Sequence, residues 1–162
     1  MDDLFNPAQW NVVPHGAALL IAYLLALPIG WNRELEERSA GLRTFPLVAV
    51  ATCGFVQAVE PVTAQSPEAL ARVIEGLITG MGFIGGGAIL RRGNSVKGTA
   101  TAASLWITGA VGVAVGTGSL DVAIALALIT AATLWFITPL KEREDLSSDD
   151  RPPDETEKGR EA

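Results

Sequence analysis

Few residues of this chain are of the types that catalyse reactions or bind metals. The 162 residues include a single histidine, His15, and a single cysteine, Cys53. Neither has a neighbour at the spacing of a metal site, and no serine stands beside a plausible general base. We therefore expect a protein that is not an enzyme and that carries no cofactor.

A glycine pattern raises the question of nucleotide binding. Gly80, Gly82 and Gly85 match the dinucleotide-binding spacing, which requires a preceding strand and an acidic residue about 20 positions later. Here the glycines lie inside an apolar run, and the first acidic residue after Glu75 is Asp121. Helix packing explains them better, because helices approach closely in lipid where Cβ atoms are absent.

Hydroxyl side chains form a row on one expected helix. Thr101, Ser104 and Thr108 are spaced at i, i+3 and i+7, so they share one helix face. In lipid, such hydroxyls most often bond to backbone carbonyls one turn earlier or to a neighbouring helix. The alternative interpretation is a polar wall along the path of a hydrated ion.

Two further features suit this ion-path interpretation. Residues 82–87 hold four glycines, among them Gly86, which could unwind a helix and expose carbonyls at membrane depth. Glu75, an acidic residue inside an apolar run, could gather cations such as Mg²⁺ at the entrance. Its structural alternative is an ion pair with Arg72, three residues earlier on the same helix.

These residues lie on or between five apolar stretches, which predict an all-α membrane helix bundle. Each stretch holds 15 to 19 residues, and a bilayer core needs about 20. A soluble bundle would show charged helix faces at a 3.6-residue period, which these stretches lack. We therefore expect about five short transmembrane helices, at residues 16–31, 45–59, 73–90, 100–115 and 122–140.

The basic residues predict an orientation, because cytoplasmic loops next to membrane spans are enriched in Lys and Arg. Of the 12 basic residues, Arg72 alone lies in an even-numbered loop. The others are Arg33, Arg38, Arg43, Arg91, Arg92, Lys97, Lys141, Arg143, Arg151, Lys158 and Arg160. An odd number of spans, with the N-terminus outside and the C-terminus in the cytoplasm, produces this alternation.

Residues 141–162 differ from the rest of the chain in composition. They hold half of the acidic residues and show no apolar periodicity, which is typical of a disordered segment. We therefore divide the chain into a transmembrane domain, residues 1–140, and a charged cytoplasmic tail, residues 141–162. Because the net charge of −6 is concentrated in the tail, it indicates neither a binding surface nor a nucleic-acid partner.

Local signals mark several expected helix ends. Thr44 could cap the second helix, and Ser66, followed by Pro and Glu, has the form of a helix start. Glycine predicts tight turns at residues 93–94 and at residues 116–119.

Charged residues flank the first loop. Arg33, Glu34 and Arg43 stand at expected helix ends, where basic side chains can reach lipid headgroups. Their plain role is to set the topology, and the alternative is a docking surface for a partner.

Four segments in this order closely resemble the MgtC/SapB family of bacterial inner-membrane proteins. They are IGWNRE (29–34), SAGLRTFPLV (39–48), RVIEGLITGMGFIGGGAIL (72–90) and VKGTATAASLWITGAVGVAVG (96–116).

The resemblance implies an inner-membrane protein linked to magnesium homeostasis and to growth when magnesium is scarce. Family members have often been labelled magnesium transporters. For the best-known branch, the resemblance suggests regulation of other membrane machinery, including the proton-translocating ATP synthase. This chain departs from the family at Glu75, where relatives usually carry glutamine, and in the charged tail, where several members carry a folded domain.

We therefore weigh two functions, a regulator and, as the alternative, a transporter of Mg²⁺ or another small ion. For the regulator, the candidate residues are Arg33, Glu34, Arg43 and Thr44, together with the small-residue helix faces that include Gly82, Gly85 and Gly86. For the transporter, they are Glu75, residues 82–87 and the hydroxyl row Thr101, Ser104 and Thr108. The small-residue faces also predict a homo-oligomer.

Overall fold

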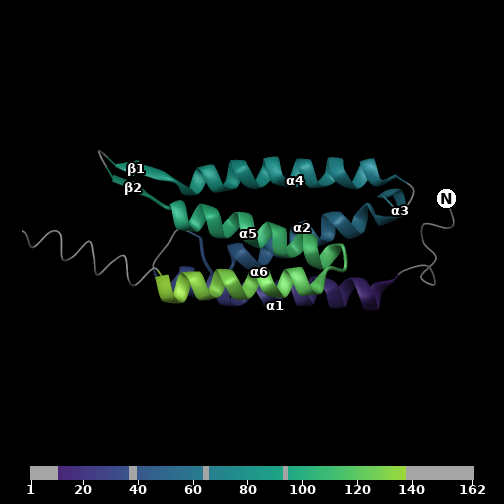
Figure 1. Cartoon of the computed structure of the whole chain (residues 1–162), viewed down its shortest axis with the longest axis horizontal. Helices are drawn as coiled ribbons and strands as arrows, with labels where there is room; N and C mark the ends of the chain where they lie inside the picture. The colour runs from purple at the N-terminus through teal and green to yellow at the C-terminus, as the bar shows by residue number, and fades with distance from the viewer. Residues whose placement is uncertain (1–10, 37–39, 64–65, 93–94, 138–162) are drawn as a thin grey trace, which may run out of the picture.

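The computed structural model describes residues 11–36, 40–63, 66–92 and 95–137, and these residues are predominantly helical (Figure 1). The elements are α1 (Val12–Leu35), α2 (Thr44–Ala58), α3 (Glu60–Thr63), α4 (Pro67–Ala88), β1 (Leu90–Arg92), β2 (Ser95–Lys97), α5 (Thr99–Gly116), α6 (Leu120–Ala132) and the π-helical turn η3 (Thr133–Ile137). The all-α bundle that the sequence predicts is confirmed. Arg38 and the predicted tail, residues 141–162, lie outside the described residues.

The long helices run in alternating directions (Figure 1). The ends of α1 and α4, the starts of α2 and α5, and the β1–β2 hairpin lie together at one end of the bundle, hereafter the hairpin end. The start of α1, α3 and the α5–α6 turn lie at the opposite end. Gly118 has a φ of +80° in that turn, which glycine adopts without strain. The turn predicted at residues 116–119 is therefore confirmed.

Four described helical segments are long and apolar enough to cross a bilayer, namely α1, α4, α5 and α6 continued by η3. The fifth, α2, is a shorter apolar helix of 15 residues, which is below the length of about 20 that a bilayer core needs. The helices match the five predicted stretches, but α1 and α4 extend beyond them by a turn or more at one or both ends. Hydropathy places the apolar centre of a helix, whereas capping and packing decide where the helix ends.

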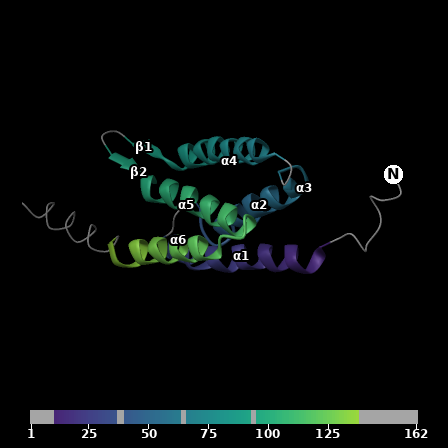
Figure 2. The same cartoon turned by 45° about the vertical axis from the view of Figure 1, so that its right-hand side comes forward.

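Helix α5 is central, and it packs against α1, α2, α4 and α6. The largest cluster of buried side chains is built from small residues, which let helix backbones approach closely. Its members are Ala22, Ala26, Ala49, Cys53, Val111, Ala114, Val115, Ala123 and Ala127. In both views α4 lies on the far side of α5 from α1 and α6 (Figure 1 and Figure 2).

Between α4 and α5 the structure has a two-stranded antiparallel hairpin, which the sequence analysis did not predict. It flanks residues 93–94, where a tight turn is predicted and which themselves lie outside the described residues. Its two short strands pair backbone N–H and C=O groups that lie between the ends of the two helices. One prediction of a helix start was wrong. Thr44 is the first residue of α2 rather than its cap, which is Arg43.

Candidate functional site

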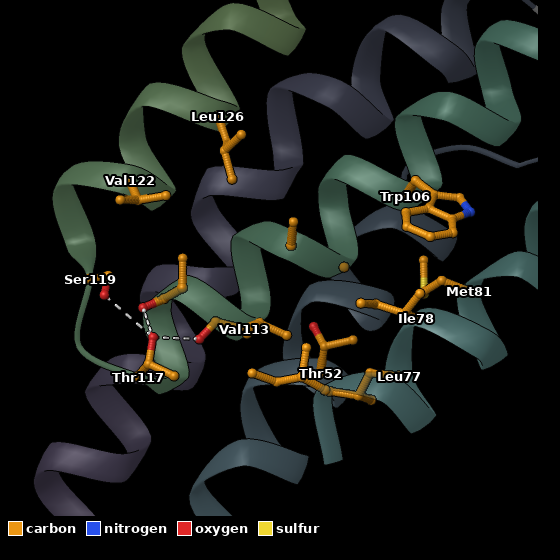
Figure 3. Close-up of a pocket in the computed structure, with 14 residues that line it drawn as sticks. Thr52, Leu77, Ile78, Met81, Trp106, Val113, Thr117, Ser119, Val122 and Leu126 are labelled. Atoms are coloured by element: carbon orange, nitrogen blue, oxygen red, sulfur yellow. Dashed lines mark hydrogen bonds between the residues drawn. The ribbon is translucent and has the colours of Figure 1, made fainter. Parts of the chain in front are cut away.

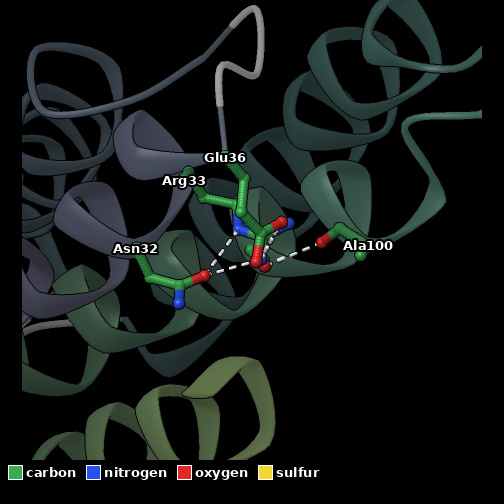
Figure 4. A network of polar contacts seen from close by, with 5 residues as sticks. Asn32, Arg33, Glu36 and Ala100 are labelled. Carbon is green, nitrogen blue, oxygen red and sulfur yellow. Dashed lines mark hydrogen bonds and ion pairs between the residues drawn. The ribbon is translucent and has the colours of Figure 1, made fainter. Parts of the chain in front are cut away.

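A charged network lies buried at the hairpin end, in the last turn of α1. Arg33 is 1% exposed, although it is the largest of the fully buried side chains. Its Nη2 lies 2.9 Å from Oε2 of Glu36 and donates to Oδ1 of Asn32 at 2.6 Å, and its Nε donates to the same oxygen at 3.2 Å. Figure 4 shows these three side chains grouped beside the backbone of Ala100, in the first turn of α5.

The loop between α1 and α2 is held against the same helix turn. The backbone N–H of Leu42 donates to Oε2 of Glu34 at 3.1 Å. Gly41 leaves room for that carboxylate, since a Cβ there would collide with it, and Gly30 packs against the Gly41 carbonyl. The segments IGWNRE and SAGLRTFPLV, separate in the sequence, thus form one contact. Arg43 is exposed and Thr44 half-buried at its edge.

The hydroxyl row of α5 continues from this network into the bundle. Thr101 and Ser104 are 2% exposed and Thr108 is 0% exposed. Ser104 donates to the carbonyl of Ala100 at 2.7 Å, and Thr108 donates to that of Ser104 at 2.8 Å. The structural interpretation of these hydroxyls, bonds to carbonyls one turn earlier, is therefore confirmed for Ser104 and Thr108.

The network lies at the end of α1, beside the first turn of α5 (Figure 4), and its polar groups compensate one another. Removing two charges from water costs several kcal/mol per ion, so a buried pair persists when its geometry and further hydrogen bonds compensate. Arg33 meets this condition through both Glu36 and Asn32. Among the described residues, no three His, Cys, Asp or Glu side chains could jointly hold a metal ion.

The glycine-rich part of α4 is a regular, unbroken helix. Residues 82–87 lie within α4, which is continuous from Pro67 to Ala88. The unwound segment considered for an ion path is therefore absent from this described region. A Cβ added at Gly85 would lie 3.5 Å from Trp106 of α5, whereas a Cβ added at Gly82 or Gly86 would meet no atom within 4 Å.

Glu75 and Arg72 both lie exposed in the first half of α4. Among the described residues, the ion pairs within 4.0 Å are His15–Glu60 and Arg33–Glu36, so the Arg72–Glu75 pair considered as the structural alternative is not formed. Nothing in the described part of the chain surrounds the Glu75 carboxylate with further metal ligands.

Two apolar grooves flank α4. The first, hereafter the α4–α6 groove, has a volume of about 390 Å³ and runs from Trp106 to Val122 and Leu126 (Figure 3). The second, the α2–α4 groove, has a volume of about 420 Å³. It is lined by Val48, Ala51, Thr52, Phe55, Val59, Val73, Gly76, Leu77, Gly80, Met81 and Ile84.

A comparison with protein-family models matches residues 19–143 to the MgtC family. The chain belongs to the MgtC family. Among curated proteins it is similar to Protein MgtC of Brucella abortus (strain 2308), with 39% identity over 132 residues, covering 81% of this chain and 55% of the relative. Protein MgtC of Salmonella typhimurium (strain LT2) is 39% identical over 116 residues, covering 72% of this chain and 49% of the relative.

This chain spans about half the length of the MgtC proteins that it matches. The matched region includes the buried network, the hydroxyl row and α4. No solved structure matches the chain. Membership in this family, together with the apolar helices, makes the chain a membrane protein.

Sequence reasoning missed the partners of Arg33. Asn32 and Glu36 stand at i−1 and i+3 from it, and the i+3 spacing brings a carboxylate onto the same helix side. The sequence alone could therefore have predicted this ion pair. It could not predict the grooves beside α4, because they depend on how α4 tilts against α2 and α5.

Proposed function

We propose that this chain serves adaptation to scarce magnesium by contacting other proteins of the bacterial inner membrane, and that it does not itself transport magnesium. The link to magnesium rests on the family resemblance. The same resemblance suggests the proton-translocating ATP synthase as one candidate partner. No enzyme chemistry and no cofactor are part of this proposal.

The proposal rests on the distribution of polar and apolar groups in the structure. Arg33 and Thr108, which could line an ion path, are buried, and their polar atoms bond within the protein. The accessible features are the apolar grooves on both sides of α4. A protein that acts through contacts in lipid needs such a surface, because apolar packing and close backbone approach drive helix association there.

The basic residues support an orientation. Arg33, Arg43, Arg91 and Lys97 are at the hairpin end, and Arg72 is near the other end. By the enrichment of Lys and Arg in cytoplasmic loops, the hairpin end faces the cytoplasm and the N-terminus is outside.

A transporter of Mg²⁺ or another small ion is the second candidate. It is favoured by the continuity of the polar groups, which run from the Arg33 network along α5 to Thr108. Glu75 would be its outer cation ligand. This function needs a conformation in which the buried row meets water.

A second copy of the chain is one candidate contact for α4. Gly76 and Gly80 are four residues apart on the wall of the α2–α4 groove, and a Cβ at either would meet no atom within 4 Å. Small residues at this spacing are common in helix–helix interfaces in membranes. We therefore include a homo-oligomer in the proposal.

Site-specific photo-cross-linking in living cells tests the proposal. A photoreactive residue replacing Ile84, which lines the α2–α4 groove and is 44% exposed, is expected to form adducts with a specific membrane protein or a second copy. The same residue replacing Leu105, which is 1% exposed, is the control and should form none.

Growth provides the functional readout. Gly80→Leu, which fills the groove, should slow growth on scarce magnesium without lowering the amount of protein. Ala125→Leu, on the exposed side of α6, should not. Normal growth of the Gly80→Leu strain, with no adducts at position 84, would contradict the proposal.

A further inference from the structure

Two charged side chains of α4 have no counter-charge in the described part of the chain. Arg72 and Glu75 are both exposed, and neither takes part in the ion pairs that the described residues form. The remaining charged residue of α4, Glu68, accepts a hydrogen bond from Ser66 at the start of the helix. A base and an acid without an ion-pair partner therefore stand three residues apart on one helix.

The position of Glu75 along α4 makes its charge costly in a bilayer. Glu75 precedes Ala88, the last residue of α4, by 13 residues, which is about 20 Å at a rise of about 1.5 Å per residue. If α4 crosses a hydrocarbon core of about 30 Å with Ala88 at one boundary, the Glu75 carboxylate lies inside the core. An ionised group there is costly unless it is paired. The long Arg72 side chain can extend toward the headgroups, but the shorter Glu75 side chain reaches less far.

The two charges begin a row of residues on the outward face of α4. This row, hereafter the outward row, has alternating spacings of three and four residues and consists of Arg72, Glu75, Thr79, Gly82 and Gly86. All five residues are exposed, and none lines either groove. By helical spacing the row lies opposite Met81, which is buried on the side of α4 that packs on α5. Alternating spacings of three and four are those of helices that pair along their length.

Apolar side chains flank the outward row. Ile78 is 46% exposed and Phe83 is 86% exposed, and by helical spacing they lie on opposite sides of the row. In parallel helices that pair through such a row, the flanking residues of one helix contact those of the other. Thr79 needs no polar partner in this contact, because its hydroxyl donates to the carbonyl of Glu75 at 2.9 Å. The charges of Arg72 and Glu75 are thus what a partner has to match.

A second copy of the chain supplies both missing charges. Two copies inserted in the same orientation carry Arg72 and Glu75 at the same depths, with their α4 helices parallel. In a symmetric pair, each contact that one copy makes is repeated by the other. Arg72 of one copy and Glu75 of the other are offset by about 4.5 Å along the helix axis, a distance that the arginine side chain spans. An unrelated partner would have to carry an acid and a base at the same two depths.

We propose that α4 pairs with α4 of a second copy through the outward row, with Arg72 of each copy bound to Glu75 of the other. An arginine and a carboxylate form charge-assisted hydrogen bonds, which are stronger than neutral ones. This inference rests on the homo-oligomer included in the proposed function, and it assigns the contact to a face that leaves the α2–α4 groove free. Because the contact joins folded copies, the unfolding of one copy in dilute micelles should not depend on it.

Charge reversal in liposomes tests the pairing. The full chain, with Cys53 replaced by alanine, would carry a donor or an acceptor dye on a cysteine at position 148, and energy transfer would measure association. Arg72→Glu and Glu75→Arg, each alone, should weaken association about tenfold or more, because both ion pairs are replaced by like charges. Mixing Arg72→Glu copies with Glu75→Arg copies should restore association. Asp121→Arg, exposed at the start of α6, is the control and should associate normally.

A cysteine cross-link keeps the inference testable if charge reversal disturbs insertion. In the Cys53→Ala background, Thr79→Cys leaves both charges in place and should form a disulfide between copies when membranes are treated with copper phenanthroline. Thr133→Cys is the matched control and should form none. Thr133 is also exposed, and its hydroxyl, like that of Thr79, donates to a carbonyl one turn earlier.

The outcomes separate this inference from the proposed function. Absence of the Thr79→Cys disulfide, or association in the mixture no stronger than that of either variant alone, would overturn the inference. Adducts at position 84 without a disulfide at position 79 would overturn it and leave the contact with other proteins standing. A disulfide at position 79 without adducts at position 84 would support it, while contradicting the proposed contact in the α2–α4 groove.

Discussion

Glycine residues have opposite structural roles in helices α4 and α5. Both are apolar and rich in glycine, yet over their most apolar 18 residues 56% are buried in α5 and 11% in α4. On α5, a Cβ at Gly112 would collide with α2, and one at Gly109 would lie 3.1 Å from the Met81 side chain. On α4, a Cβ at Gly80 would meet open space.

The difference separates a closely packed region around α5 from an open surface along α4. Around α5, small side chains let α1 and α2 approach closely, and Arg33 lies buried near the end of α1. Along α4, absent side chains leave grooves. Substitutions in the first region should therefore lower stability, and those in the second should change contacts.

The largest effect is expected at the buried charge. Arg33→Met leaves Glu36 without the charge that compensates its burial, and it should lower the free energy of unfolding by about 3–5 kcal/mol. Arg72→Met, on exposed α4, should change it by less than about 0.5 kcal/mol. SDS titration of the protein in mixed micelles measures both. Equal effects would remove the distinction between the two regions.

The glycines provide the next comparison. Gly112→Ala forces a Cβ against the Ala49 carbonyl and the Thr52 hydroxyl, so it should destabilise the protein by about 1–3 kcal/mol. Gly80→Ala meets no neighbour and gains helix propensity, so it should be neutral or stabilising by about 0.5–1 kcal/mol. The same titration applies. A destabilising Gly80→Ala would mean that α4 packs more tightly than described.

A substitution of Glu34 tests whether its side chain holds the loop between α1 and α2. Glu34→Ala removes the acceptor of the Leu42 N–H, and it should lower stability by about 0.5–1.5 kcal/mol. Faster amide exchange at Leu42, measured by hydrogen exchange, is the local sign. Unchanged exchange there would show that the bond does not hold the loop. Glu75→Ala, exposed on α4, is the control.

The smallest effect is expected in the hydroxyl row. Thr108→Val removes a bond to the Ser104 carbonyl but keeps the shape of the side chain, so it should change stability by less than about 1 kcal/mol. Thr79→Val removes the equivalent bond to the Glu75 carbonyl on exposed α4 and is the matched control. A much larger loss at Thr108 would indicate a polar contact beyond its own helix.

Much of the fold could be predicted from the sequence, because apolar length and the alternation of basic loops are properties of the chain itself. The four long apolar helices, the shorter α2 and the turn at Gly118 follow from such local signals. The hairpin and the starting residue of α2 depend on backbone pairing near helix ends, which composition does not encode.

The candidate site was predicted less completely. Arg33, Glu34 and the hydroxyl row were identified, and the bonds of Ser104 and Thr108 were expected. That Arg33 is buried against α5, and not directed to headgroups, depends on how closely α1 approaches α5. The open side of α4 likewise depends on helix placement, so the glycine run alone could not distinguish a core from a surface.

Magnesium flux tests the central claim most directly. The purified full chain would be reconstituted in liposomes that contain a magnesium-sensitive dye, and magnesium would be added outside. The account predicts no flux above that of empty liposomes, because the hydroxyl row is buried and α4 is an unbroken helix through residues 82–87. A flux that Glu75→Gln or Thr101→Val abolishes would contradict it and favour the transporter.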